Sequence, residues 1–67
     1  MRIKESRRGF FSGTHKQHTI EINREPDGRF YILVKHFEGG YAYDGWAPED
    51  VRTMKAAKKE ALKGAMI

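Results

Sequence analysis

The chain has 67 residues, which makes one small domain near the lower limit for folding without crosslinks. It contains no cysteine, which excludes disulfides and cysteine-ligated zinc, while 39% apolar and 33% charged residues indicate a globular chain. The longest apolar run is five residues, so we expect no membrane span, no secretory signal and a cytoplasmic location.

Charge is distributed unevenly along the chain. Residues 1–18 hold five basic residues and one acidic residue, residues 19–51 hold three and seven, and residues 52–67 hold five and one, within a net charge of +4. The two basic ends could meet a polyanion such as nucleic acid, or they could screen the acidic middle of the same chain. Composition leaves both interpretations open.

The N-terminal part, residues 1–16, is polar and interrupted by glycine. It forms either a basic arm or an extra edge strand of the sheet that follows. Phe10 and Phe11 argue against a disordered tail, because a free tail gains nothing from two adjacent phenylalanines. We therefore predict a single domain over residues 17–67, with this segment ordered before it.

A first β-hairpin is predicted between two strands that meet at a Glu-Pro-Asp-Gly turn. Pro26 suits the second position of a type I turn, and Gly28 can take the left-handed conformation of a bulge that follows it. The turn and the apolar alternation select the same register. The expected pairs are Glu25 with Arg29, Ile22 with Ile32, and Ile20 with Val34.

A second hairpin is predicted at Gly39 and Gly40, which accept the positive φ angles of a two-residue turn. The register then sets His36 against Tyr43, Lys35 against Asp44, and Leu33 near Trp46. The run 30–37 is apolar on both alternations, so this sheet has a core face and a second, mixed face. The core face would hold Ile20, Ile22, Phe30, Ile32, Val34, His36, Tyr41 and Tyr43. The second face would hold Thr19, Glu21, Asn23, Tyr31, Leu33, Lys35, Phe37, Ala42, Asp44 and Trp46.

Residues 53–66 are rich in strong helix formers and predict a C-terminal helix, either with Thr53 as its N-cap or with a start one turn earlier at Pro48. One helical face carries Met54, Ala61, Leu62 and Ala65, and Lys58 near its centre must extend along its own methylenes to reach water. The predicted class is α+β: a three-stranded antiparallel sheet, order β-β-β-α, packed on one helix, with room for an extra N-terminal edge strand.

No pattern in the chain indicates catalysis, a metal or a cofactor. His15 and His18 are three residues apart in a strand or loop, where this spacing does not converge ligands, and His36 is better explained as a core residue beside Tyr43. The serines lie in no nucleophile elbow, and the glycines do not have phosphate-loop spacing. We expect a protein that is not an enzyme.

The positive signals are basic and aromatic. Tyr31, Phe37 and Trp46 could stack on bases, although Glu21 and Asp44 share their face. Alternatively, Phe10 and Phe11 cover that face, or a second copy does. The basic residues predicted to contact nucleic acid are Arg2, Lys4, Arg7, Arg8, Lys35, Lys55, Lys59 and Lys63.

The order of parts, with the passage from Trp46 through Pro48 and the Thr53 cap to Lys58, resembles small sheet-plus-helix DNA-binding domains. These are the arm-type N-terminal domain of tyrosine recombinases and the AP2-type domain, and the resemblance covers residues 17–66. It implies DNA binding by an exposed sheet face, in a small accessory protein of a phage or mobile element. The alternative is a protein-binding adaptor or inhibitor that uses the aromatic face, also as a homodimer. Neither hypothesis involves a membrane.

Overall fold

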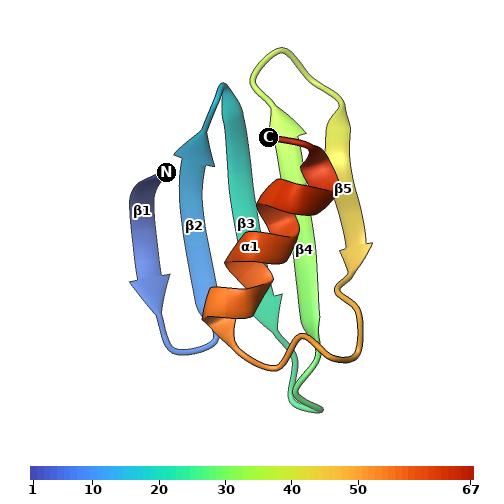
Figure 1. Ribbon diagram of the computed structural model, residues 1–67. Helices are drawn as coiled ribbons and strands as arrows, with labels where there is room; N and C mark the ends of the chain where they lie inside the picture. Colours follow the sequence, from blue (N-terminus) through green and yellow to red (C-terminus); the bar gives the residue numbers. More distant parts are fainter.

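The computed structural model describes all residues, 1–67, and shows a five-stranded antiparallel sheet followed by one helix (Figure 1). The strands lie side by side in the order in which they occur in the chain. The expected three-stranded sheet is therefore wrong, whereas the α+β class with the sheet before the helix is confirmed. The elements are β1 (Arg2–Arg7), β2 (Phe10–His15), β3 (His18–Arg24), β4 (Phe30–His36), β5 (Tyr41–Trp46) and α1 (Met54–Ala65).

The two additional strands come from the segment expected to be an arm or a single edge strand. β1 is exposed along its whole length, with Ile3 59% exposed, so it has no apolar alternation that would mark it as a strand. The turn between β2 and β3 consists of Lys16 and Gln17, both at positive φ (46° and 66°). Such turns are usually made by glycine or asparagine, so the sequence does not show this hairpin.

β2 belongs to the sheet because Phe11 is fully buried on the helix side and pairs with Ile22. Gly13 lets β1 approach, since a Cβ there would lie 2.6 Å from the carbonyl oxygen of Arg2. Phe10 points to the opposite face, in the alternation of a strand. The alternative in which both phenylalanines cover the second face is therefore wrong, and no other segment covers that face.

The β3–β4 hairpin has the expected register. Ile22 pairs with Ile32, Ile20 pairs with Val34, and the Glu25 N–H donates to the Arg29 carbonyl at 2.8 Å. The expected left-handed glycine is also present, because Gly28 has a φ of 90°.

The β4–β5 hairpin is shifted by two residues from the expected register. Tyr43 pairs with Val34 instead of His36, and Asp44 pairs with Leu33 instead of Lys35. The turn is longer than two residues, since the His36 N–H donates to the Gly40 carbonyl at 3.0 Å. A shift of two keeps each side chain on its face, so Tyr43 still faces the helix.

A bulge in β5 changes the face of one further residue. The register slips between Val34 and Lys35, which leaves Ala42 as the extra residue and pairs Tyr41 with Lys35. Tyr41, expected in the core, is 58% exposed on the face of the sheet opposite the helix, with the Lys35 Nζ atom 5.9 Å from its ring centre.

The helix is as expected. The Thr53 hydroxyl accepts the Ala56 N–H at 3.1 Å, and α1 packs across β3, β4 and β5. Ala57 and Ala61 are fully buried, and small side chains at these positions bring the helix close to the sheet. At 12 residues, α1 is too short and too polar to cross a membrane. The buried core comprises Phe11, Ile20, Ile22, Phe30, Ile32, Val34, Ala47, Ala57 and Ala61.

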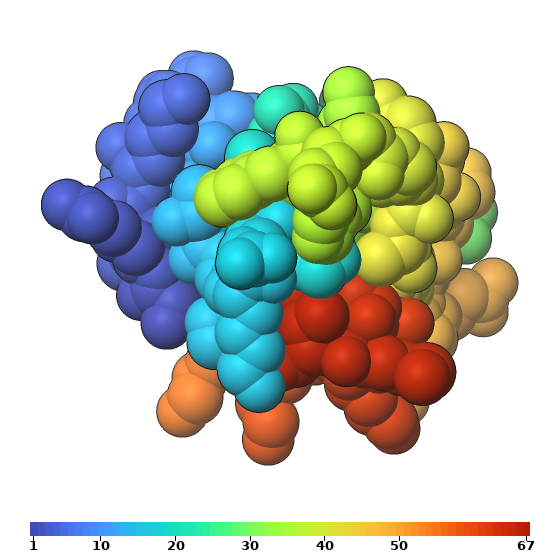
Figure 2. Space-filling model, turned by 90° about the horizontal axis from the view of Figure 1, so that it is seen from above, coloured from blue at the N-terminus to red at the C-terminus, as the bar shows by residue number.

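Figure 2, a view from above along the sheet, shows the helix on one side of the sheet only. Because α1 contacts β3, β4 and β5, it leaves the helix side of β1 uncovered as well as the whole opposite face. We call the face opposite α1 the open face. These two uncovered regions are the surfaces on which a site can form.

Tyr43 connects β5 to the C-terminal half of α1 through a hydrogen bond and a close packing contact. The Tyr43 hydroxyl donates to Glu60 Oε2 at 2.9 Å, and a Cβ at Gly64 would overlap the Tyr43 ring. The missing side chain of Gly64 therefore lets the helix end reach the sheet.

We predict that Gly64→Ala destabilises the protein by about 1–3 kcal/mol, because the added methyl overpacks the contact with Tyr43. At an exposed helix position the same change would instead stabilise by about 1 kcal/mol. Chemical denaturation of both proteins measures the difference. In a Tyr43→Ala background the clash is absent, so Gly64→Ala should become stabilising there. Destabilisation of equal size in both backgrounds would contradict the contact.

A second prediction concerns alkaline pH. Burial, together with the hydrogen bond to Glu60, raises the pKa of Tyr43 from 10.0 to about 12. Between these values the unfolded chain loses the phenol proton while the folded chain keeps it, so the free energy of unfolding decreases as pH rises. Below pH 10 this contribution is fully present. Thermal melts between pH 9 and 12 should show a shallower loss for Tyr43→Phe than for the parent; identical slopes would contradict the assignment.

Candidate functional site

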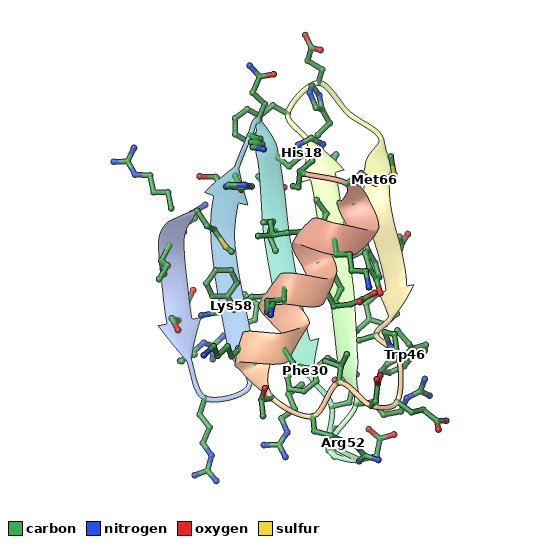
Figure 3. The ribbon with its side chains drawn as sticks, viewed as in Figure 1. His18, Phe30, Trp46, Arg52, Lys58 and Met66 are labelled. Carbon is green, nitrogen blue, oxygen red and sulfur yellow. The ribbon has the colours of Figure 1, made fainter.

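One end of the sheet gathers most of the arginines. In an antiparallel sheet in chain order, the ends of β1, β3 and β5 and the starts of β2 and β4 lie at the same edge. Five of the six arginines in the chain are located there, in strand ends and connecting segments. We call this edge the arginine end; its members are Arg7, Arg8, Arg24, Arg29 and Arg52. Figure 3 labels Arg52 at this edge, far from His18 at the other.

On the helix side of the arginine end lies a groove of about 470 Å³ between the β1–β2 turn and the start of α1. Five basic residues line it and no carboxylate does. The backbone N–H of Arg24 donates to the Gly9 carbonyl at 2.8 Å, which holds the end of β3 beside the β1–β2 turn. We call this feature the basic groove; its cations are Arg7, Arg8, Arg24, Arg52 and Lys58.

Little of this positive charge is compensated. The one ion pair is between Arg7 Nε and Glu5 Oε2 at 2.8 Å, and both side chains are more than half exposed. An exposed pair of this kind contributes little energy and leaves its cation available. No other cation of the basic groove has a carboxylate within the 4.0 Å of an ion pair. The cations of the groove therefore repel one another, and an anion that binds between them lowers this repulsion.

Lys58 reaches the groove from the helix. It is half-buried, as expected for a lysine near the centre of the packed face, and its Nζ atom lies 4.4 Å from the centre of the Phe11 ring. Figure 3 shows its side chain beside α1, over the β2 side of the sheet. The ring therefore helps to hold an ammonium group at the edge of the groove.

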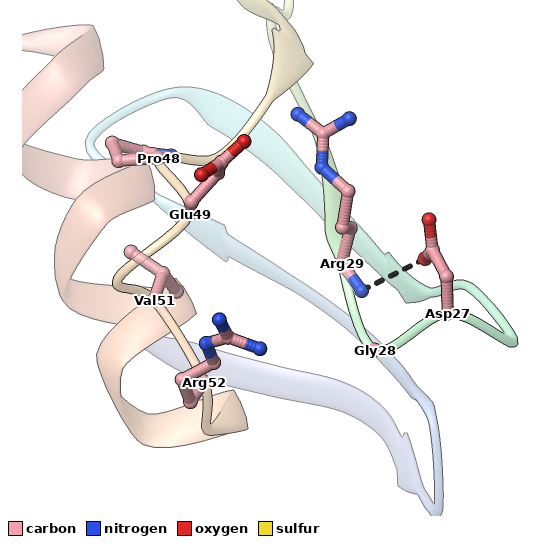
Figure 4. A pocket seen from close by; sticks show the side chains of 7 residues that line it. All are labelled: Asp27, Gly28, Arg29, Pro48, Glu49, Val51 and Arg52. Atoms are coloured by element: carbon pink, nitrogen blue, oxygen red, sulfur yellow. Dashed lines mark hydrogen bonds between the residues drawn. The ribbon is translucent and has the colours of Figure 1, made fainter.

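A smaller pocket of about 170 Å³ also lies at the arginine end, between the β3–β4 turn and the segment that joins β5 to α1 (Figure 4). Arg29 and Arg52 line it together with the carboxylates of Asp27 and Glu49. Asp27 Oδ1 accepts the backbone N–H of Arg29 at 3.0 Å. Since cations and carboxylates balance here, this pocket lacks the excess of positive charge that distinguishes the basic groove.

The open face carries aromatic side chains at the same end. The register places Phe10, Asn23, Tyr31 and Trp46 in one row across β2 to β5. The Tyr31 and Trp46 rings meet edge to face with centres 5.1 Å apart. Guanidinium groups lie at both ends of the row, Arg7 at 4.8 Å from the Phe10 ring and Arg29 at 4.7 Å from the Trp46 ring. We call these four residues the aromatic row.

Two further rows cross the open face beyond the aromatic row; the first of them is acidic and the next is basic. Tyr31 donates to Asp44 Oδ1 at 2.7 Å, and this hydrogen bond is the main cause of the raised pKa of Tyr31. Acids and bases along the face nearly cancel, so it attracts phosphate less than the basic groove does. The second row, the acidic row, holds Glu5, Ser12, Glu21, Leu33 and Asp44, and the third holds Arg2, Thr14, Thr19, Lys35 and Tyr41.

The structure separates the basic residues predicted from the sequence. Arg7 and Arg8 lie in the basic groove, whereas Arg2 and Lys35 lie in the third row of the open face. Lys4 occupies the bulge of β1. The three helix lysines are apart from the groove, and two of them line a pocket that also contains Asp50 and Glu60. They are Lys55, Lys59 and Lys63.

The predicted aromatic residues are also only partly together. Tyr31 and Trp46 are in contact, but Phe37 lies in the β4–β5 turn at the opposite end, 60% exposed. The expected pairing of Lys35 with Asp44 is not formed, because the β4–β5 register differs and Tyr31 binds that carboxylate.

Sequence reasoning missed three arginines of the arginine end and the one lysine of the basic groove. The arginines lie at a strand end or in segments between elements, the lysine lies within α1, and no local motif connects them. The available signal was topological: once five antiparallel strands are recognised, alternate strand ends must share an edge. The missed residues are Arg24, Arg29, Arg52 and Lys58.

The histidines lie at the other end of the sheet. His15 pairs with His18, which pairs with His36, and the last two rings are 4.9 Å apart. His36 Nδ1 accepts the Glu38 N–H at 3.1 Å, so the expected pairing of His36 with Tyr43 is wrong. No group of three potential ligands is arranged to hold a metal ion.

No protein-family model, no curated protein and no solved structure matches this chain. The resemblance to sheet-plus-helix DNA-binding domains therefore stays a prediction.

Proposed function

We propose that this protein is a small nucleic-acid-binding module that holds phosphates in the basic groove. The observation that carries the proposal is the lining of that groove, which includes five cationic residues and no carboxylate. Each phosphate that binds there displaces condensed counterions, which makes association favourable at low salt. Four of the five cations are arginines, whose planar guanidinium groups can bind phosphate oxygens in pairs.

The groove suits a polymer better than a single small anion. Its cations come from β1, the β1–β2 turn, the end of β3, the segment before α1 and α1 itself. Charges spread over this many elements can contact several phosphates in succession. The start of α1 adds a weaker contribution, because the positive end of the helix dipole faces the same side.

Binding, not catalysis, is the proposed role. The groove is lined by cations, glycine, hydroxyl and apolar side chains, and it contains no histidine or carboxylate that could act as a general base. Strongly cationic sites of this kind attract and position polyanions. A cytoplasmic location, where nucleic acid is accessible, is part of the proposal.

A second candidate function is protein binding through the open face. No segment of the chain covers that face, and Trp46 and Tyr41 on it are 44% and 58% exposed. Exposed aromatic side chains of this kind are typical anchors of protein interfaces. Such an interface would respond weakly to salt, whereas phosphate binding weakens steeply as salt rises.

We predict that the triple variant Arg8→Ala, Arg24→Ala, Arg52→Ala loses nucleic-acid affinity and salt dependence together. Each lost phosphate contact should reduce the slope of log K against log salt by about 0.9 on duplex and about 0.7 on single strands. Fluorescence anisotropy with labelled oligonucleotides at several salt concentrations measures both quantities.

The matched control is the triple variant Lys55→Ala, Lys59→Ala, Lys63→Ala. It removes the same charge from the helix, away from the basic groove, and should retain most of the salt slope. Equal losses in the two variants would show that net charge, and not the groove, determines binding. Absence of binding by the parent protein at low salt would overturn the proposed function and favour the protein-binding candidate.

A further inference from the structure

The aromatic row and the basic groove meet at Arg7. This residue lines the groove, and its guanidinium group lies 4.8 Å from the centre of the Phe10 ring at the end of the row. Both features belong to the arginine end, the groove on the helix side and the row on the open face. A polymer that lies in the groove can therefore pass around this edge and onto the row without leaving positive charge.

The rings of the row are partly accessible. Trp46 is 44% exposed and Tyr31 is half-buried, and each ring beside an arginine has an exposed guanidinium over it. Exposed contacts between a cation and a ring are weaker than the stacking of a nucleobase on a ring. A base can therefore replace Arg29 over Trp46, and the displaced guanidinium becomes free to bind a phosphate.

We infer that the bound nucleic acid is single-stranded and that its bases stack on the aromatic row while its backbone continues into the basic groove. This inference rests on the proposed function. Bases in a duplex are already stacked on each other, so only an unpaired strand offers its faces to Trp46, Tyr31 and Phe10. Asn23, between Phe10 and Tyr31, adds an amide that can donate to and accept from a base edge.

The acidic row supports this arrangement of the strand. It lies two residues along each strand from the aromatic row, about 7 Å away. Glu5 is paired with Arg7, whereas Asp44, which accepts a hydrogen bond from the neutral Tyr31 phenol, and Glu21 at the centre of the face have no cationic partner. Phosphates are thus repelled from the centre of the open face, while uncharged bases are not.

A second copy of the chain fits the open face poorly. Two copies stacked face to face about a two-fold axis through the centre of the face place the acidic row against itself, whether the axis runs along the strands or across them. Like charges then oppose each other across the interface, a cost that a self-complementary surface avoids. Charge therefore favours the nucleic acid over a homodimer.

Trp46 is the only tryptophan, so its fluorescence reports directly on the row. We expect an oligothymidine single strand to quench it, and to bind at least about tenfold more tightly than a duplex of the same length, as stacking on two rings would give. We expect Trp46→Ala to weaken single-strand binding by about 5- to 150-fold without changing the salt slope.

Phe37→Ala is the matched control, since it removes an exposed aromatic ring at the opposite end of the sheet. It should change single-strand affinity by less than about twofold, because no stacking contact is lost. Thermal melts show whether Trp46→Ala is folded. If it is not, Tyr31→Phe and Trp46→Phe replace it in the binding measurement, and both should retain most of the binding because they keep a ring. Arg29→Ala should keep the quenching of Trp46 fluorescence.

The outcomes separate the two proposals. Equal affinity for duplex and single strand, with unchanged Trp46 fluorescence, would overturn the stacking inference and leave the groove proposal standing. Equal losses of single-strand affinity in Trp46→Ala and Phe37→Ala would also overturn it. So would a homodimer that is detected by sedimentation and that buries Trp46. If neither nucleic acid binds at low salt, the proposed function itself fails.

Discussion

The close contact between α1 and one face of the sheet determines most other features of this molecule. Ala57 and Ala61 are fully buried there, and Gly64 lacks the Cβ that would overlap Tyr43. Small residues at these positions let a short helix bury the apolar side chains of β3 and β4 beneath it, namely Ile20, Ile22, Ile32 and Val34. This contact is the main apolar burial available to a chain of 67 residues. Without this contact the sheet would have no hydrophobic core on either side.

A single helix cannot cover five strands. α1 spans β3, β4 and β5, so the helix side of β1 and the β1–β2 turn lie outside the area that the helix covers. The basic groove occupies the space that results, with Phe30 and Met54 among its lining residues and the arginines around them. The candidate site is therefore a direct consequence of where the helix ends its coverage, and Lys58 over Phe11 marks that boundary.

Charge is sorted in space differently from the way it is sorted along the chain. The acidic middle of the sequence contributes Glu21 and Asp44 to the open face, while Arg24 and Arg29 from the same middle join the arginine end. Basic residues from all three parts of the chain meet there because antiparallel strands return to one edge every second strand. The site we propose for phosphate thus contains Arg24, a cation from the segment that is acidic overall.

The sequence by itself determined the β3–β4 hairpin, the helix and most of the core face, although Tyr41 lies on the open face instead. Pro26 and Gly28 define that turn, and Thr53 defines where α1 begins, by contacts within a few residues of each other. Ile20 and Ile22 define the register, because their alternation matches that of the adjacent strand across this one turn. Such local contacts leave a readable pattern, and these predictions were confirmed.

Only the tertiary structure decided the rest. β1 is a strand because β2 is beside it, and the β2–β3 turn forms although Lys16 and Gln17 are not typical turn residues, since Phe11 gains burial under that pairing. In the β4–β5 register that forms, Tyr43 reaches Glu60 on the helix, a contact that spans 17 residues. The arginine end and the aromatic row depend on these long-range pairings. Neither could be predicted from the sequence, because side chains far apart in the chain meet there through backbone pairing and burial that no local pattern encodes.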